Sequence, residues 1–363
     1  MKRNPSVELM RIIACLIVLA CHCNFLVIKS GYPFFDRYIT AILCDGVAVF
    51  FMITGFFIFN NKSYKKLWLH FLTRVFVPML ILYVVDLFFG DFILSKCSLT
   101  ESLTNGLHHI SDYALSIILL KAPSPTMDHT WYIFAYLLLT FLFPILKSFA
   151  DCIKNDPTRQ KIFIILTLVM WVANDALQNK LMGFGFRGAA VIIPSSLLVV
   201  WGYLIYEKRE LFTKKIYIVI SPIAFLLVNL LRAFLTYFTE ENNLGDYSNL
   251  NVWYSVFGLI NAILIISFCL SVVRGDKVNA GRKVVCFIAS FTYGIYLIHP
   301  LVQESAYHLG FIDYLSEALS GMPSWAYYVI ALLISALLSF IVCFLICLIL
   351  RPIKKLFGLL KKK

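Results

Sequence analysis

Blocks of about 20 apolar residues recur along the 363-residue chain and constrain its fold more than any other feature. A block of this length crosses the roughly 30 Å hydrocarbon core of a bilayer as one helix. Charged residues make up 14% of the chain, against roughly 25% in soluble proteins. The sequence therefore predicts an all-α, polytopic membrane helix bundle, expected as a single integral-membrane domain over residues 1–363.

The apolar blocks predict about ten transmembrane helices. Most of the 32 lysines and arginines fall in every second loop between these blocks. Cytoplasmic loops carry such an excess, so the pattern predicts that both termini are cytoplasmic, and the basic tail 351–363 is expected to bind anionic lipid. The net charge of +12 thus indicates topology and not a nucleic-acid partner. The predicted spans are 7–28, 40–59, 71–90, 130–149, 162–179, 188–206, 216–237, 252–273, 284–307 and 325–350.

The loop over residues 91–129 is expected outside the cytoplasm and is long enough for structure of its own. It opens with Ser98-Leu-Thr-Glu101, a capping-box pattern that predicts the start of a short helix.

The ten cysteines lie mostly inside apolar blocks and lack metal-ligand spacing, so we expect no metal site.

The first span contains two residues that are costly in a membrane, Arg11 and His22. A charged side chain at the bilayer centre costs at least ~2.5–3.5 kcal/mol on insertion scales. Eleven residues correspond to nearly three full helical turns, so both side chains share one face, roughly 16 Å apart along the axis. The alternatives are that Arg11 snorkels to the interface and that His22 makes a structural hydrogen bond between helices.

Further polar residues are predicted at the depth of His22. They could neutralise one another as a structural network, or they could line a polar cavity open to the outside. Their convergence on one layer that includes a histidine favours the cavity. These residues are Asp45, Asp86, Asp175, Arg187, Arg232 and His299.

On the cytoplasmic side, Arg74 with Arg11, Lys65 and Lys66 is expected to hold the phosphates of an anionic ligand. Ordinary positive-inside charge is the alternative explanation for Arg74. A bundle with a cationic inner vestibule and a titratable outer cavity suits acyl transfer to a hydroxyl, with histidine as the base. It equally suits a transporter or flippase for a glycan or small metabolite, and the residues alone leave both classes open.

Five short segments carry a resemblance to a known family. They are Glu8-Leu-Met-Arg11-Ile-Ile-Ala14 with His22, which has Arg-x10-His spacing; Phe50-Phe-Met-Ile-Thr-Gly55-Phe56; Arg74-Val-Phe-Val-Pro78; His129-Thr-Trp131-Tyr132; and Phe291-Thr-Tyr-Gly-Ile-Tyr296-Leu-Ile-His299-Pro300. Together they resemble the motifs of acyltransferase family 3, the membrane O-acetylases of bacterial surface polysaccharides. One difference is Phe71, which stands where the family often has a second arginine three residues before Arg74.

The resemblance implies acetyl-CoA as the cytoplasmic donor and a sugar hydroxyl as the acceptor, in the inner membrane of a bacterium. It assigns His22 as general base or acyl relay and Arg11 to the donor side. We expect Asp45 or Asp175 to orient His22 and His299 to steady an oxyanion. The expected partners are the bilayer, a glycan or lipid-linked saccharide and, as an open alternative, a second copy of the chain. Residues expected to bind the acceptor are Trp131, Asp86, Arg187 and Arg232.

Overall fold

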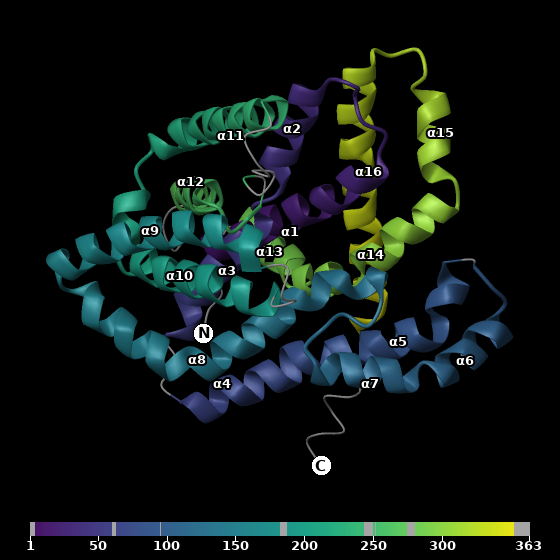
Figure 1. Ribbon diagram of the computed structural model, residues 1–363, viewed down its shortest axis with the longest axis horizontal. Helices are drawn as coiled ribbons and strands as arrows, with labels where there is room; N and C mark the ends of the chain where they lie inside the picture. Colours follow the sequence, from purple (N-terminus) through teal and green to yellow (C-terminus); the bar gives the residue numbers. More distant parts are fainter. Residues whose placement is uncertain are drawn as a thin grey trace.

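The protein is all-helical in the computed structural model (Figure 1). Two site predictions, Asp175 and Arg187, concern side chains that lie outside the described part, as does the basic tail beyond Arg351. The structure describes residues 4–59, 63–94, 96–181, 187–242, 250, 252–273 and 280–351, without the side chains of 172–190.

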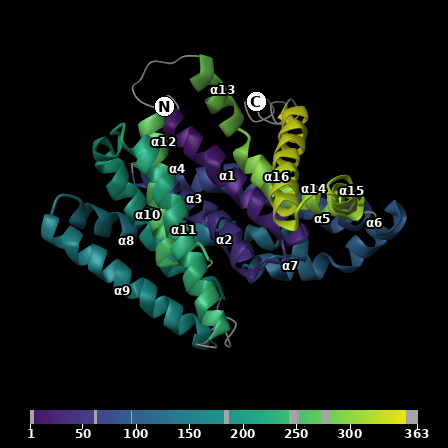
Figure 2. The ribbon, with the colours of Figure 1, turned by 90° about the horizontal axis from the view of Figure 1, so that it is seen from above.

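Helix α1 (Pro5–Leu26) lies at the centre of the bundle (Figure 2). It packs against six other helices: α2 (Pro33–Leu43), α3 (Gly46–Ile58), α12 (Val256–Val272), α13 (Ala280–Ala289), α14 (Thr292–His308) and α16 (Ser324–Ile349). Asn4 caps its first turn by accepting a hydrogen bond from the Ser6 N–H at 3.0 Å, and Pro5 occupies the first helical position. The helix is continuous from Arg11 to His22, so the shared face predicted for these two residues is retained.

The second predicted span is two helices, α2 (Pro33–Leu43) and α3 (Gly46–Ile58), separated at Cys44 and Asp45. A Cβ atom on Gly46 would lie 2.6 Å from the carbonyl oxygen of Ala14. Only glycine therefore permits this close approach of α3 to α1.

The third span contains a π-helical turn. Helix α4 (Tyr64–Phe71) continues through η1 (Leu72–Phe76) into α5 (Val77–Ile93). Pro78 has no N–H to donate, and the Val77 N–H bonds the carbonyl of Leu72, five residues back. Tyr293 donates to the carbonyl of Val75 at 2.6 Å, which ties this turn to α14.

The outer loop has the short helix that the sequence predicted. Helix α6 (Leu99–His108) begins with a complete capping box between Ser98 and Glu101. The loop continues with α7 (Ile110–Ile118) and a 3-10 turn, η2 (Pro125–Thr130), which leads into α8 (Trp131–Lys154). In Figure 1, α5, α6 and α7 lie together at the lower right.

The remaining helices complete the bundle around α1. They are α9 (Pro157–Leu181), α10 (Arg187–Glu207), η4 (Arg209–Phe212), α11 (Tyr217–Glu241), α12 (Val256–Val272), α13 (Ala280–Ala289), α14 (Thr292–His308), α15 (Phe311–Ala318) and α16 (Ser324–Ile349).

The helices make this a multi-pass membrane protein. Within the described residues, 6 helical segments are long and apolar enough to cross a membrane. The pair α13 and α14, bent by 53°, raises the number to 7, while Val191–Glu207 and Val256–Val272 are shorter apolar helices. The ten predicted spans exceed this number by the three that fall on α9, α10 and α12, which within the described residues are not both long and apolar enough to be counted.

Candidate active site

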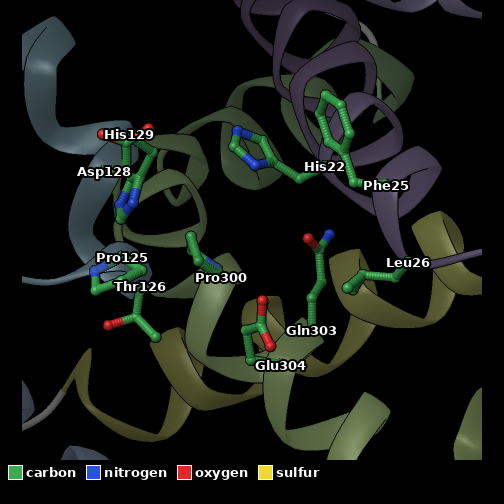
Figure 3. A pocket seen from close by; sticks show the side chains of 10 residues that line it. All are labelled: His22, Phe25, Leu26, Pro125, Thr126, Asp128, His129, Pro300, Gln303 and Glu304. Carbon is green, nitrogen blue, oxygen red and sulfur yellow. The ribbon is translucent and has the colours of Figure 1, made fainter.

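A cavity of about 260 Å³ opens beside the end of α1 (Figure 3). Figure 3 shows the His22 ring pointing into it from α1, with Gln303 and Glu304 entering from α14. We call this cavity the histidine pocket. Its lining residues are His22, Phe25, Leu26, Pro125, Thr126, Asp128, His129, Pro300, Gln303 and Glu304.

Three histidine rings meet at the histidine pocket. The ring centroids of His22 and His299 are 4.9 Å apart, and those of His129 and His299 are 5.2 Å apart. His299 is fully buried and lies behind the pocket wall. His129 was not among the predicted site residues, although the segment that begins with it contributed to the family resemblance.

Backbone carbonyls fix which nitrogen carries the proton in two of these rings when they are neutral. His129 donates from Nε2 to the carbonyl of Leu297 at 3.1 Å, and His299 donates from Nδ1 to that of Tyr296 at 2.7 Å. A carbonyl only accepts, so Nδ1 of His129 and Nε2 of His299 are left as acceptors. Both atoms are buried and have no hydrogen-bond partner among the described residues.

Two carboxylates, Asp128 and Glu304, line the histidine pocket, and neither was predicted. Asp128 is close enough to act electrostatically on His22. It directly precedes His129, so it is carried by the same 3-10 turn. No group of three or more His, Cys, Asp or Glu side chains is placed to hold a metal ion within the described part of the chain.

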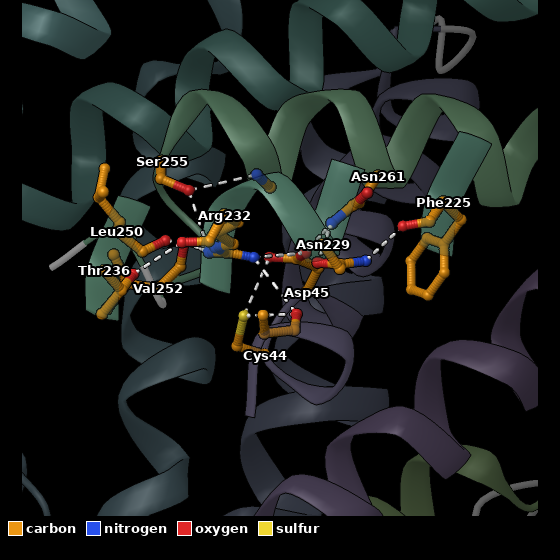
Figure 4. Close-up of polar contacts among 12 residues, drawn as sticks. Cys44, Asp45, Phe225, Asn229, Arg232, Thr236, Leu250, Val252, Ser255 and Asn261 are labelled. Atoms are coloured by element: carbon orange, nitrogen blue, oxygen red, sulfur yellow. Dashed lines mark hydrogen bonds and ion pairs between the residues drawn. The ribbon is translucent and has the colours of Figure 1, made fainter. Parts of the chain in front are cut away.

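The predicted partnership of Asp45 with His22 is not what the structure shows. Asp45 instead accepts from Arg232 at 2.9 Å and from Asn261 at 2.6 Å (Figure 4). Both members of the ion pair are fully buried and neither lines the histidine pocket. A charge in this setting needs a counter-charge, and depth in the membrane does not say which face of a helix a residue occupies.

Arg232 is likewise placed apart from the predicted acceptor site. Besides Asp45, it donates to the carbonyl of Val252 at 2.7 Å, to Ser255 Oγ at 3.0 Å and to the carbonyl of Leu250. These bonds join α2, α11 and the segment before α12, so the contacts of Arg232 are structural.

Trp131 and Asp86 lie near the histidine pocket without lining it. Trp131 stacks on Trp253, with ring centroids 5.4 Å apart and planes at 11°. Asp86 accepts hydrogen bonds from Tyr113 and Ser124 at 2.6 Å and from Thr126 at 2.9 Å. Because Thr126 lines the pocket, Asp86 positions part of the pocket wall.

Toward the other end of α1 lies Arg11, one of the cationic residues predicted for the donor. Arg11 pairs with Glu8 at 2.9 Å, and its guanidinium lies 5.5 Å from the centroid of the Phe57 ring. Arg11 and Arg74 both lie within electrostatic range of His70. Arg74 is exposed, as are Lys65 and Lys66 on α4.

The helices and the histidine pocket define a multi-pass membrane protein with a titratable site at one end of its central helix. The model of the acyltransferase domain of acyltransferase family 3 matches residues 4–346. The chain belongs to this family and is an acyltransferase, which confirms the resemblance and favours an enzyme over a transporter or flippase. No curated protein and no solved structure shows a significant match to the chain.

Proposed function

We propose that this acyltransferase moves an acetyl group from cytoplasmic acetyl-CoA to a sugar hydroxyl of a cell-surface or lipid-linked glycan. One observation carries the proposal. The continuous helix α1 joins Arg11, in a cationic region, to His22, in the histidine pocket. Donor and acceptor sites at opposite ends of one helix suit a reaction whose substrates arrive from opposite sides of a membrane.

The topology that fits this reaction has ten spans and two cytoplasmic termini, in the inner membrane of a bacterium. The alternation of lysines and arginines between loops supports it. In this topology Arg11 and Arg74 face the cytoplasm, and His22 lies roughly 16 Å further toward the outer leaflet.

The donor phosphates are assigned to Arg74 and Arg11. A guanidinium binds phosphate oxygens through two parallel N–H bonds, and both residues lie close to His70. Lys65 and Lys66, exposed one to two helical turns before His70, add positive charge at the entrance. The acetyl thioester would extend from these groups toward His22.

In the reaction, His22 takes the proton from the sugar hydroxyl as its oxygen attacks the thioester carbonyl carbon. The new C–O bond forms, the C–S bond breaks, and the His22 imidazolium returns the proton to the leaving thiolate. Asp128 stabilises the imidazolium. Nε2 of His299, which has no hydrogen-bond partner among the described residues, serves as the acceptor for the other N–H of His22. This replaces the expected oxyanion role of His299, since a nitrogen that accepts cannot also donate to an oxyanion.

The direct test is His22→Ala in membranes, with His308→Ala as a control on an exposed histidine of α14. Transfer of labelled acetyl from acetyl-CoA to extracted surface glycan is expected to be lost in the first variant and kept in the second. Transfer that persists in His22→Ala at normal expression would exclude His22 as the base.

A further inference from the structure

We propose that a second cavity, next to the histidine pocket, binds a sugar residue of the acceptor adjacent to the one that is acetylated. The inference rests on the proposed function. The cavity is about 170 Å³ in volume and lies among α5, α6, α7 and the segment before α8. It shares Pro125 and Thr126 with the histidine pocket, so one extended ligand can occupy both.

One wall of the second cavity is held in place by hydrogen bonds. Asp86 accepts from Tyr113, Ser124 and Thr126, and Ser124 and Thr126 also bond each other at 2.8 Å. Asp86 is itself only 6% exposed. Its carboxylate is therefore occupied by these hydrogen bonds. Asp86 holds the shared wall in place and does not itself bind the sugar.

Two further lining residues carry polar side chains that are not hydrogen-bonded within the described part of the chain. Asp91 and Asn105 line the second cavity, and their side chains form no hydrogen bond with another described residue. A carboxylate accepts two or more hydrogen bonds, and a carboxamide both donates and accepts. Neighbouring sugar hydroxyls present this mixture of donors and acceptors, so Asp91 and Asn105 suit a saccharide.

The charges around the second cavity favour an uncharged ligand. The carboxylates of Asp86 and Asp91 line the cavity together with a single lysine, Lys96. A phosphate or carboxylate ligand would meet two carboxylates at close range, and like charges raise the cost of binding. The neutral hydroxyl groups of a sugar avoid this repulsion.

The second cavity lies on the side of the protein from which a cell-surface glycan would bind. Its lining comes from the end of α5 and from the loop over residues 91–129, which lies outside the cytoplasm in the proposed topology. An acceptor bound there reaches the histidine pocket past Thr126. Two bound residues, one in each cavity, require an acceptor longer than a monosaccharide.

The test compares Asp91→Asn and Asn105→Leu with wild type in detergent-solubilised full-length protein. The acceptor is the lipid-linked oligosaccharide fraction extracted from the producing cells, and acetyl-CoA hydrolysis without acceptor is measured in parallel. Each variant is expected to raise KM for the oligosaccharide about tenfold, the loss of roughly one hydrogen bond. The value of kcat and the rate of hydrolysis should remain unchanged.

Two control variants remove the same groups elsewhere on the surface. Asp313→Asn on α15 and Asn242→Leu at the end of α11 are exposed and line neither cavity. They should leave KM for the oligosaccharide at the wild-type value. If wild type transfers acetyl and the Asp91 and Asn105 variants keep its KM, the second cavity is not an acceptor site. If wild type transfers no acetyl to any glycan, the proposed function itself fails.

Discussion

The rings of His22 and His299 lie 4.9 Å apart at an interplanar angle of 69°, one from α1 and the other from α14. His299 already donates from Nδ1 to the carbonyl of Tyr296, so its Nε2 is the atom available to His22. The ring of His22 therefore lies against a buried histidine, where the sequence suggested an aspartate. Substitutions that keep the contact of one nitrogen and remove that of the other can therefore measure what each nitrogen of His299 contributes to activity.

Replacing His299 with Asn should keep the hydrogen bond made by Nδ1 and remove the acceptor at Nε2. The Asn amide can still donate to the carbonyl of Tyr296, but it lacks a group at the position of Nε2. Acetyl transfer is expected to fall about 100-fold or more, the usual range for a disturbed general base. His299→Gln, whose amide oxygen reaches the Nε2 position, should recover part of the rate. Equal rates of acetyl transfer in the two variants would contradict a role of His299 Nε2 in positioning His22.

Replacing Arg74 with Ala should weaken donor binding. Losing a charge-assisted hydrogen bond costs about 1.5–3 kcal/mol, so KM for acetyl-CoA should rise about 10-fold or more while kcat changes little. Acetyl-pantetheine, which lacks the nucleotide phosphates, should show the same KM in wild type and variant. Arg159→Ala, at an exposed arginine near the start of α9, is the control. An unchanged KM for acetyl-CoA in Arg74→Ala would remove Arg74 from the donor site.

The buried pair of Asp45 and Arg232 should matter for stability and not for chemistry. Arg232→Met leaves a carboxylate unpaired in the interior and should destabilise the protein by about 3–5 kcal/mol. Combining it with Asp45→Asn removes that charge and keeps an acceptor for Asn261, so the thermal midpoint should partly recover. Acetyl transfer per folded molecule should then stay near wild type. A large loss of transfer in the folded double variant would restore Asp45 as a catalytic candidate.

The capping box of α6 should weaken at low pH. The Ser98 N–H and hydroxyl bond the Glu101 carboxylate at 2.9 and 2.8 Å, and these bonds lower the pKa of Glu101 below its ordinary value of 4.5. A lowered folded-state pKa stabilises the helix above the unfolded pKa, and this contribution is lost as pH falls through the folded pKa. Hydrogen-exchange protection of the first α6 amides should therefore drop between about pH 6 and about pH 3. Glu101→Gln should show no such pH dependence, and an equal drop in both proteins would contradict the assignment.

Much of the fold was predictable because the signals are local. The length of each apolar run located a helix, and the Ser98 and Glu101 pattern marked the start of α6. Breaks within apolar runs were not predicted. The interruption at Asp45 depends on the approach of Gly46 to α1, and the 53° bend between α13 and α14 occurs between two apolar helices. Neither feature follows from the length or the apolarity of a run.

The sequence predicted the candidate site best for the two residues that lie on a single helix. Arg11 and His22 share a face of α1 because of helical periodicity alone. Asp128, His129 and Glu304 come from two other segments, and no spacing within the sequence brings them to His22. Asp45 and Arg232 were predicted at the depth of His22, but in the structure they pair with each other because each buried charge requires the other.

By itself, the sequence determined that this protein is a helical membrane protein, which helix carries Arg11 and His22, and which family it resembles. These properties follow from apolar length, helical phase and short motifs, all of which are local. Only the tertiary structure decided that His299 and His129 surround His22, that Asp45 belongs to Arg232, and that a second cavity adjoins the first. Those relationships depend on which faces of separate helices pack together, and depth in a membrane does not specify a face.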